Sequence, residues 1–241
     1  MLFRSLDHGR SIRRECRLDG VLQSVGVTHA DGWYAEVMRR RLAIIFFLKG
    51  CPIDGKLAPD LFDPDQISLT QEKNPLGWGN IVNLFINNHT EDYLLIMDPS
   101  TIFLADPIPK TLDALNSGFQ GVGWKGGLVN LEDQWRSTDD KGVGEVDVLF
   151  SYYFAFDRTF VQKAGGANPS AKYYRNADIE LSLAIRAAGG RLIQVDLPLE
   201  QGRHHGYYDT DPDYRDKNSK KNYQRILERF RGKNEILSPR R

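Results

Sequence analysis

The chain has 241 residues, which is enough for one large domain or two small ones with a sizeable buried core. Hydrophobic residues make up 41% and aromatic residues 11%, a composition that excludes an intrinsically disordered chain. The 32 basic residues balance 32 acidic ones, so the formal charge is zero and a strongly basic nucleic-acid binder is excluded as well.

Two cysteines, Cys16 and Cys51, are too few for a disulfide framework, so we expect a reducing, intracellular setting. No apolar run approaches the roughly 18 to 20 residues that a membrane-spanning helix needs. The polar start, Met1 to Arg14, does not read as a secretory signal. We therefore expect a cytoplasmic protein that is at most attached to a membrane surface. Residues Leu2 to Ser5 match one reading frame of a common sequencing-library adapter, and we hold as a hypothesis that the natural chain begins further upstream.

Apolar runs and helical periodicity alternate along the first half of the chain. Leu42 to Leu48 is a continuous apolar run, as expected for a strand covered on both faces. Gln66 to Thr70 is a shorter strand candidate, and Asn80 to Asn88 has helical spacing after a turn at Asn74 to Gly77. Tyr93 to Met97 is another buried strand. Strand, helix and strand with short connections predict a parallel sheet.

One carboxylate follows the strand Tyr93 to Met97 directly. In parallel sheets, ligands bind beyond the carboxyl ends of the strands. Asp98 stands at such an end and is therefore a candidate ligand-binding residue. The alternative is that Asp98-Pro99 only turns the chain.

The second half of the chain continues the alternation. Phe119 to Trp124 and Val146 to Phe156 read as strands, and the second is rich in aromatic residues. Asp178 to Ala188 is predicted to be a helix, because its apolar residues recur at spacings of three, four and seven and Gly189-Gly190 follows. Arg191 to Val195 is the next strand.

The tail from Asp213 onward is basic, with ten basic residues against four acidic ones. Within it, an apolar stripe at helical spacing is formed by Tyr223, Ile226, Leu227 and Phe230. One interpretation is a terminal helix docked on the domain with a solvated basic face. The other is a surface helix attracted to anionic lipid or to a lipid-diphosphate acceptor.

Taken in order, these motifs resemble family 2 glycosyltransferases, and most closely the rhamnosyltransferase-like branch. The resemblance covers roughly residues 42 to 232 and rests on order and spacing. The matching segments are Asn74 to Asn83, Tyr93 to Thr101, Val148 to Arg158, Tyr174 to Gly189, His204 or His205, and Asn218 to Phe230.

The resemblance implies an α/β fold of the GT-A type, a Rossmann-like and mainly parallel sheet flanked by helices. It divides the chain into a poorly matched amino-terminal segment (1–41), a GT-A domain (42–212) and a basic amphipathic carboxyl-terminal helix (213–241). The implied activity is transfer of a sugar from a nucleotide-sugar donor to an acceptor hydroxyl on a glycan or lipid-linked saccharide, with inversion, in polysaccharide biosynthesis. The donor sugar would be a hexose or a deoxyhexose.

Asp178 is the expected general base. Glycosyl transfer needs a base near the acceptor hydroxyl, and the start of a helix favours an ionised carboxylate. The family position that matches Asp178 usually carries this role. The alternative role for Asp178 is that of a simple helix cap. Glu180 is the reserve candidate for the general base.

The resemblance also implies a divalent cation, Mg²⁺ or Mn²⁺, at the donor diphosphate. Such hard cations prefer oxygen ligands. Asp98 and His205 are the expected metal ligands. Ser100 stands where the family usually has the second carboxylate. Three consequences are open: metal binding is weakened, the enzyme is impaired, or cations such as Arg203 and Lys125 help to neutralise the charge of the donor diphosphate.

Other site residues follow from the matched positions. The expected donor-binding residues are Asn74, Gly77, Asn83, Asp98 and Ser100. The expected acceptor-binding residues are Trp124, Tyr152 and Tyr153. Ordinary turn and helix-start chemistry is the alternative for Gly77 and for Trp78, and core packing is the alternative for the aromatic residues.

Two departures from the family pattern favour a second interpretation. Ser100 replaces a carboxylate in the triplet Asp98-Pro99-Ser100, and Leu48 to Cys51 stands where an aspartate motif usually contacts the nucleobase. Residues 1 to 41 also contain no clear counterpart of the opening strand, which truncation of the chain would explain. A GT-A-shaped binding or assembly subunit without turnover would also fit these departures. A nucleotidyltransferase is a third interpretation, but the glycine-rich phosphate loop that it needs is not found.

Overall fold

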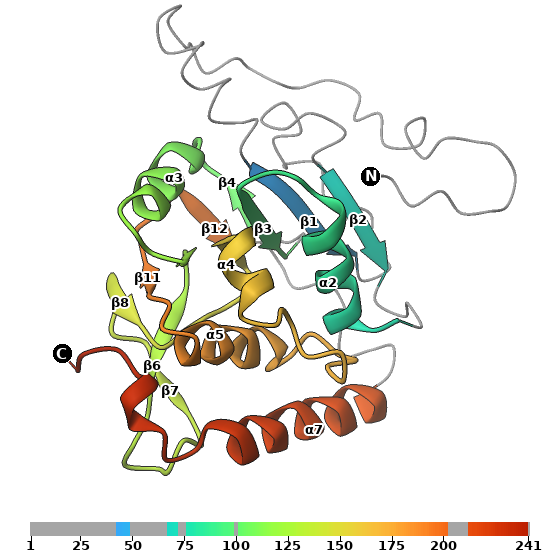
Figure 1. Ribbon diagram of the computed structural model, residues 1–241, viewed down its shortest axis with the longest axis vertical. Helices are drawn as coiled ribbons and strands as arrows, with labels where there is room; N and C mark the ends of the chain where they lie inside the picture. The colour runs from blue at the N-terminus through green and yellow to red at the C-terminus, as the bar shows by residue number, and fades with distance from the viewer. Residues whose placement is uncertain (1–41, 49–66, 72–75, 99–100, 202–211, 241) are drawn as a thin grey trace, which may run out of the picture.

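The computed structural model describes residues 42–48, 67–71, 76–98, 101–201 and 212–240, with backbone only for residues 42–48, 67–71, 212, 214 and 215. Figure 1 shows a central sheet with helices on both sides and one long helix, α7, packed below it. The strand at 42–48 agrees with the sequence-based expectation, whereas the carboxyl-terminal helix expected over 213–241 ends at Phe230. Asn74, Ser100, Arg203 and His205 lie outside the described residues.

The central sheet has seven strands in the order β2-β1-β3-β10-β5-β11-β8. Five of them (β1, β2, β3, β5 and β11) point the same way, while β10 and β8 run opposite to their neighbours. The sheet is therefore mainly parallel, as predicted. The strands are β1 (Leu42–Leu48), β2 (Ile67–Gln71), β3 (Tyr93–Met97), β5 (Gly121–Gly123), β8 (Gly144–Val146), β10 (Tyr153–Asp157) and β11 (Leu192–Gln194).

The central strand β3 is buried on both faces, which explains its unbroken apolar sequence. Leu94 and Ile96 face one layer of helices, while Leu95 and Met97 face the other. The first layer contains α2 (Trp78–Asn88), α4 (Arg158–Lys163) and α5 (Ala177–Ala187). The second layer contains α3 (Ile108–Asn116), which the sequence analysis did not predict.

The segment predicted as one strand from Val146 to Phe156 is wrong in its extent. It contains the last residue of β8, then β9 (Val148–Leu149), and then β10, which follows a turn at residues 150–152. β9 leaves the central sheet and pairs with β6 (Gly126–Val129), which also pairs with β7 (Thr138–Asp139). A further antiparallel pair joins β4 (Thr101–Phe103) to β12 (Leu199–Gln201).

The carboxyl-terminal helix α7 (Pro212–Phe230) is docked on the domain, in agreement with the first of the two interpretations. Ile226 and Phe230 are buried against Leu183 of α5 and Val129 of β6. None of the described helices is long and apolar enough to cross a membrane.

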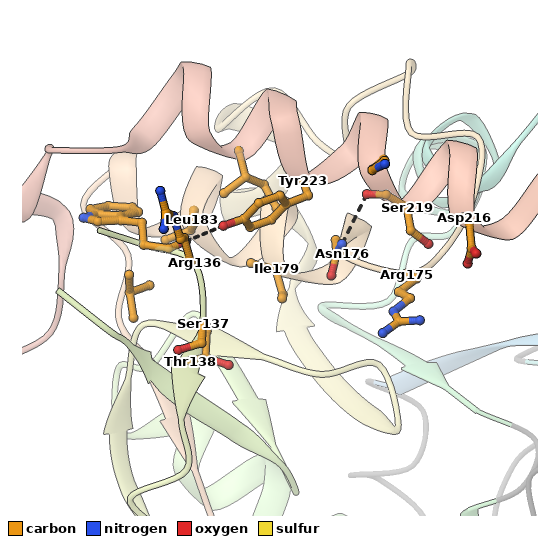
Figure 2. Close-up of a pocket in the computed structure, with 14 residues that line it drawn as sticks. Arg136, Ser137, Thr138, Arg175, Asn176, Ile179, Leu183, Asp216, Ser219 and Tyr223 are labelled. Atoms are coloured by element: carbon orange, nitrogen blue, oxygen red, sulfur yellow. Dashed lines mark hydrogen bonds between the residues drawn. The ribbon is translucent and has the colours of Figure 1, made fainter. Parts of the chain in front are cut away.

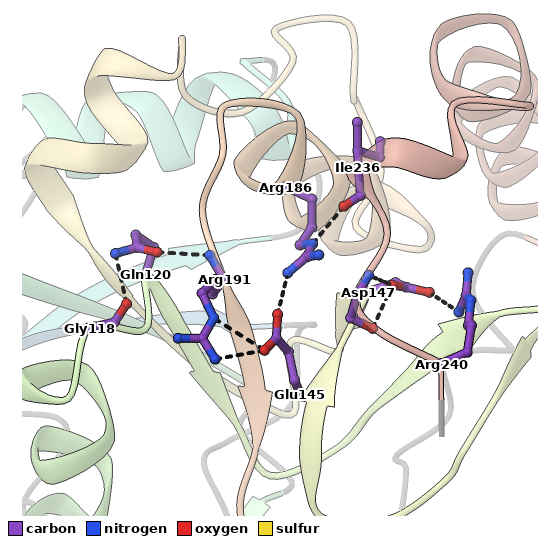
Figure 3. A network of polar contacts seen from close by, with 9 residues as sticks. Gly118, Gln120, Glu145, Asp147, Arg186, Arg191, Ile236 and Arg240 are labelled. Carbon is purple, nitrogen blue, oxygen red and sulfur yellow. Dashed lines mark hydrogen bonds and ion pairs between the residues drawn. The ribbon is translucent and has the colours of Figure 1, made fainter.

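The chain after α7 is fastened by a buried carboxylate. A short 3-10 helix, η4 (Asn234–Ile236), leads into Ser238, whose main-chain N and Oγ both donate to Asp147. Arg186 of α5 also donates to the carbonyl of Ile236 and to Glu145 (Figure 3). The tail therefore holds α7 in place through specific polar contacts as well as apolar packing.

Candidate functional site

The turn between β9 and β10 lies beside the carboxyl end of β3. The antiparallel register pairs Tyr153 with Met97, so the residues that precede Tyr153 adjoin the residue that follows Met97. The carbonyl of Tyr152 accepts a hydrogen bond from the main-chain N of Asp98 (3.2 Å) and another from Thr101 Oγ1 (2.8 Å). This turn therefore fixes the backbone at Asp98.

Asp178 is held by the same turn from the other side. Its Oδ2 accepts hydrogen bonds from the main-chain N (2.9 Å) and the Oγ (3.1 Å) of Ser151, and its Oδ1 accepts one from the main-chain N of Ile179 (2.9 Å). Ser151 and Tyr152 are consecutive, so one turn joins the strand-end segment to the start of α5. The structure brings the segments of Asp98 and Asp178 together at one edge of the sheet.

The environment of Asp178 raises the pKa of its carboxyl group. Burial is the main cause, because only 8% of the residue is exposed and a buried carboxylate loses its hydration. The hydrogen bonds from Ser151 and Ile179 lower the pKa and oppose this effect in part. A carboxylate with a raised pKa accepts a proton more readily, which suits a general base.

Glu180, the reserve candidate for the general base, forms ion pairs with α7. It is 1% exposed, and its carboxylate is paired with Arg225 (3.0 Å) and Arg229 (3.1 Å) of α7. The side-chain amide of Asn168 donates to it as well, over 2.6 Å. These contacts tie α5 to α7 and leave Glu180 facing away from the turn at residues 150–152.

Two of the expected donor-binding residues make contacts within the fold. The side chain of Asn83 donates to the carbonyl of Ala167 and accepts from its main-chain N, both over 2.8 Å. Gly77 precedes α2 with φ of 77°, a conformation that favours glycine, and a Cβ there would meet Lys172. Trp78 is buried in the core. These contacts correspond to the structural alternatives for Gly77 and Trp78.

The three expected acceptor residues differ in exposure. Tyr153 is completely buried and its hydroxyl lies 2.9 Å from Thr111 Oγ1, which matches the core-packing alternative and leaves no surface for an acceptor. Trp124 and Tyr152 are half-buried. Lys125 Nζ lies 4.9 Å from the centre of the Trp124 ring.

Only one of the two expected metal ligands lies in the described part of the chain. Asp98 is half-buried at the end of β3, and His205 lies outside the described residues. Within the described part of the chain, no group of three or more His, Cys, Asp or Glu side chains is arranged to hold a metal ion. The carboxylate of Asp98 is a group of the kind that Mg²⁺ and Mn²⁺ prefer, and its role as a metal ligand stays a prediction.

A groove of about 650 Å³ lies beside the first turn of α5, which the sequence analysis did not foresee (Figure 2). Residues from three distant segments line it, so no local pattern signals it. They are Val129, Trp135, Arg136, Ser137 and Thr138 around β6 and β7; Arg175, Asn176, Ile179 and Leu183 at α5; and Asp216, Ser219, Lys220, Tyr223 and Ile226 of α7.

The groove and Asp178 occupy adjacent sides of one helical turn. Asn176 and Ile179, three positions apart, both line the groove. Asp178 immediately precedes Ile179 and faces the turn at Ser151. A ligand in the groove would therefore lie next to the helical turn that carries Asp178.

Solved structures share this arrangement of sheet and helices. PcManGT, a mannosyltransferase from Pyrobaculum calidifontis solved in complex with GDP-Man and Mn²⁺, aligns with a TM-score of 0.50 at 14% identity over 74% of this chain and 66% of its own. GalNAc-T7, solved with UDP, GalNAc and Mn²⁺, aligns with a TM-score of 0.52 at 11% identity over 78% of this chain and 47% of its own. The protein has a GT-A-like glycosyltransferase fold.

The likeness is one of fold. This GT-A-like chain spans 66% and 47% of the lengths of the two neighbours. No family model matches its sequence, and no curated protein sequence does so either. Membership of family 2 and of its rhamnosyltransferase-like branch therefore stays a prediction.

Proposed function

We propose that the protein transfers a glycosyl group from a nucleotide-sugar donor to an acceptor hydroxyl, with inversion at the anomeric carbon. The observation that carries the proposal is the turn at Ser151 and Tyr152, which bonds both to the Asp178 carboxylate and to the Asp98 backbone within a GT-A-like fold. The two structural neighbours, solved with GDP-Man and with UDP and GalNAc, support a nucleotide-sugar donor.

Asp178 is the general base of the proposed reaction. The acceptor oxygen attacks the anomeric carbon from the face opposite the nucleoside diphosphate, and the bond to the diphosphate breaks as the new bond forms. The acceptor proton passes to the Asp178 carboxylate, and the nucleoside diphosphate leaves with the bonding electron pair. Hydrogen bonds from Ser151 and Ile179 fix the orientation of the carboxylate.

Asp98 binds the donor at the same end of the sheet in the proposed reaction. Asn74 and Ser100 are further proposed donor-binding residues, and His205 is a further proposed metal ligand. A divalent cation there would neutralise charge on the departing diphosphate. Mn²⁺ accompanies both structural neighbours, which supports Mg²⁺ or Mn²⁺ for this chain. Of the proposed metal ligands, only Asp98 lies in the described part of the chain.

The finer specificity follows the sequence resemblance. We propose a hexose or deoxyhexose donor and a glycan or lipid-linked acceptor on the cytoplasmic side of a membrane, with the exposed basic side chains of α7 near the lipid surface. Docking of α7 leaves Lys217, Lys220 and Lys221 exposed, as such a contact requires.

The proposal is tested by incubating the full chain with UDP-, dTDP- and GDP-sugars and Mn²⁺ while free nucleoside diphosphate is measured. We expect release from at least one donor, and loss of that release in Asp178→Asn. Asp113→Asn, an exposed aspartate of α3, is the matched control and should behave like the wild type. Donor binding without release by the wild type would instead favour a binding or assembly subunit.

A further inference from the structure

The groove between α5, α7 and the β6–β7 connection carries an excess of positive charge. Arg136, Arg175 and Lys220 line it together with a single carboxylate, Asp216. All three cationic side chains are exposed, and none forms an ion pair with a carboxylate in the described ranges. Charges left unpaired around a concave surface attract an anion.

A buried hydroxyl without a partner lies in the same groove. Ser219 is 8% exposed, and its Oγ makes no hydrogen bond to any group in the described part of the chain. A buried polar atom of this kind normally has a partner. In Figure 2, Ser219 extends from α7 toward the side on which Arg175 lies. The hydroxyl and the guanidinium therefore offer donors to one ligand.

The backbone around the hydroxyl is fixed. Asn176, which follows Arg175, adopts a left-handed conformation with φ of 67°, and its side-chain amide donates to the carbonyl of Ser219 over 3.2 Å. This bond connects the start of α5 to α7 across the groove. The backbone positions that carry Arg175 and Ser219 are consequently connected before any ligand binds.

The rest of the groove is apolar. Trp135, Ile179, Leu183 and Ile226 contribute to its lining. A small inorganic anion would leave this apolar surface exposed to water, whereas a phosphate ester on an apolar or saccharide carrier would cover it. The charge and the shape together favour an amphipathic ligand with a phosphate group.

We propose that this groove binds the phosphate group of a phosphate-bearing acceptor, with Arg175, Lys220 and the Ser219 hydroxyl as its donors. That the ligand is the acceptor rests on the proposed function, because the groove adjoins the helical turn that carries Asp178. Binding of the phosphate ester itself does not depend on turnover.

The test measures binding to the full chain by titration calorimetry, with excess UDP and Mn²⁺ present to occupy the donor site. The probes are octyl phosphate, inorganic phosphate and the uncharged octyl glucoside. We expect octyl phosphate to bind and octyl glucoside not to. Octyl phosphate binding tighter than inorganic phosphate indicates a carrier-linked phosphate, whereas equal binding indicates a soluble phosphate.

Two variants and one control variant connect binding to the groove. Arg175→Gln/Lys220→Gln should weaken octyl phosphate binding about tenfold or more, while the control Lys163→Gln/Lys233→Gln, which removes the same charge from exposed positions outside both the groove and α7, should not. Ser219→Ala should weaken binding without lowering thermal stability, because the hydroxyl has no partner to lose. An Ser219→Ala variant that binds normally but unfolds earlier would assign the hydroxyl a purely structural role.

The inference is overturned if octyl phosphate does not bind, or if both double variants lose affinity equally. Failure of the proposed function has a different signature, since no donor would then release nucleoside diphosphate although octyl phosphate still bound. A third result would overturn only the inference about the groove. In it, the wild type consumes the donor, and Arg175→Gln/Lys220→Gln transfers sugar to phosphate-bearing acceptors at the same rate as the wild type.

Discussion

The main-chain nitrogen and the hydroxyl of Ser151 both donate hydrogen bonds to one carboxylate oxygen of Asp178, over 2.9 and 3.1 Å. A hydrogen bond to the charged form of a carboxyl group lowers its pKa. The hydroxyl bond can be removed by mutation, whereas the main-chain bond remains. Ser151 is therefore a positioning residue whose effect on Asp178 is separable from the fold of the turn.

Ser151→Ala should move the acid limb of the kcat/KM profile to higher pH. Loss of the hydroxyl bond raises the pKa of Asp178 further, so the base is ionised only at higher pH. The measurement is nucleoside diphosphate release as a function of pH, with Ser117→Ala, at an exposed serine, as control. An acid limb that stays in place or moves down would show that Ser151 does not act on the base.

Asp178→Asn should lower the rate of transfer about 10²- to 10⁴-fold, the usual contribution of a general base. The free energy of unfolding of this variant should vary less with pH than that of the wild type. The pKa of Asp178 is raised in the folded state, so the folded state binds more protons and its stability decreases as the pH rises from about 3.8 through the folded-state pKa. Asp178→Asn removes the carboxylate charge and therefore this decrease of stability with rising pH.

The variant also turns an amide NH₂ toward the N–H donor of Ser151 or of Ile179, which lowers the free energy of unfolding by a similar amount at every pH. Denaturant unfolding at a series of pH values above 3.8 should therefore show a free energy that falls less steeply with pH in Asp178→Asn than in the wild type. Donor affinity, measured in parallel, should remain within a few-fold of wild type. If the inactive variant is also unfolded, or no longer binds the donor, the loss of activity would not support Asp178 as the base.

The sequence predicted the elements whose pattern is set by burial alone. β1 and β3 were predicted with their observed bounds, because a strand covered on both faces must be apolar throughout. The turn at residues 150–152 was missed because its residues, Phe150, Ser151 and Tyr152, carry no glycine, proline or asparagine signal. Its polar atoms are satisfied by Asp98, Thr101 and Asp178, which are distant in sequence.

The sequence also could not decide which of two carboxylates is the proposed base, because distant contacts decide it. Asp178 and Glu180 both fall in the first turn of α5, and the sequence alone cannot say which one faces the turn and which one faces α7. Tertiary contacts decide it, since Glu180 meets Arg225 and Arg229. The groove is assembled from three segments and was not predictable for the same reason.

Glu180→Gln should reduce the free energy of unfolding by about 2 kcal/mol, because it removes the charge that two arginines share in a buried position. Arg229→Gln should cost less than about 1 kcal/mol, since that side chain is 48% exposed and water screens its pair. Both variants, measured by denaturant unfolding, should keep the activity per folded molecule. Loss of activity in stable Glu180→Gln would return Glu180 to the list of candidate bases.

Glu145 should make the protein sensitive to acid. Burial raises the pKa of this carboxyl group, but hydrogen bonds from Arg191 and Arg186 outweigh burial and bring the pKa below its usual 4.5. A lowered pKa gives stability that is present above about pH 4.5 and is lost as the pH falls through the folded-state value. Thermal unfolding of Glu145→Gln should therefore vary less with pH below 4.5 than that of the wild type. Equal slopes would contradict this assignment.

Asp147 should be the most sensitive point of the attachment of the tail. It is completely buried, and its two oxygens accept hydrogen bonds from the main-chain N of Val129 (2.7 Å), the N and Oγ of Ser238 (2.6 and 2.9 Å) and the guanidinium of Arg240 (2.7 Å). Asp147→Asn keeps the shape but turns an amide NH₂ toward these donors. The expected cost is about 3 kcal/mol in the free energy of unfolding.

Asp139→Asn provides the control, because Asp139 is 43% exposed and its pair with Lys141 at 4.0 Å contributes less than about 1 kcal/mol. Since the tail after α7 holds one wall of the groove, Asp147→Asn should also increase amide hydrogen exchange in α7 and weaken octyl phosphate binding. Exchange that rises uniformly over the whole chain would mean that Asp147 stabilises the fold globally and does not specifically fasten α7.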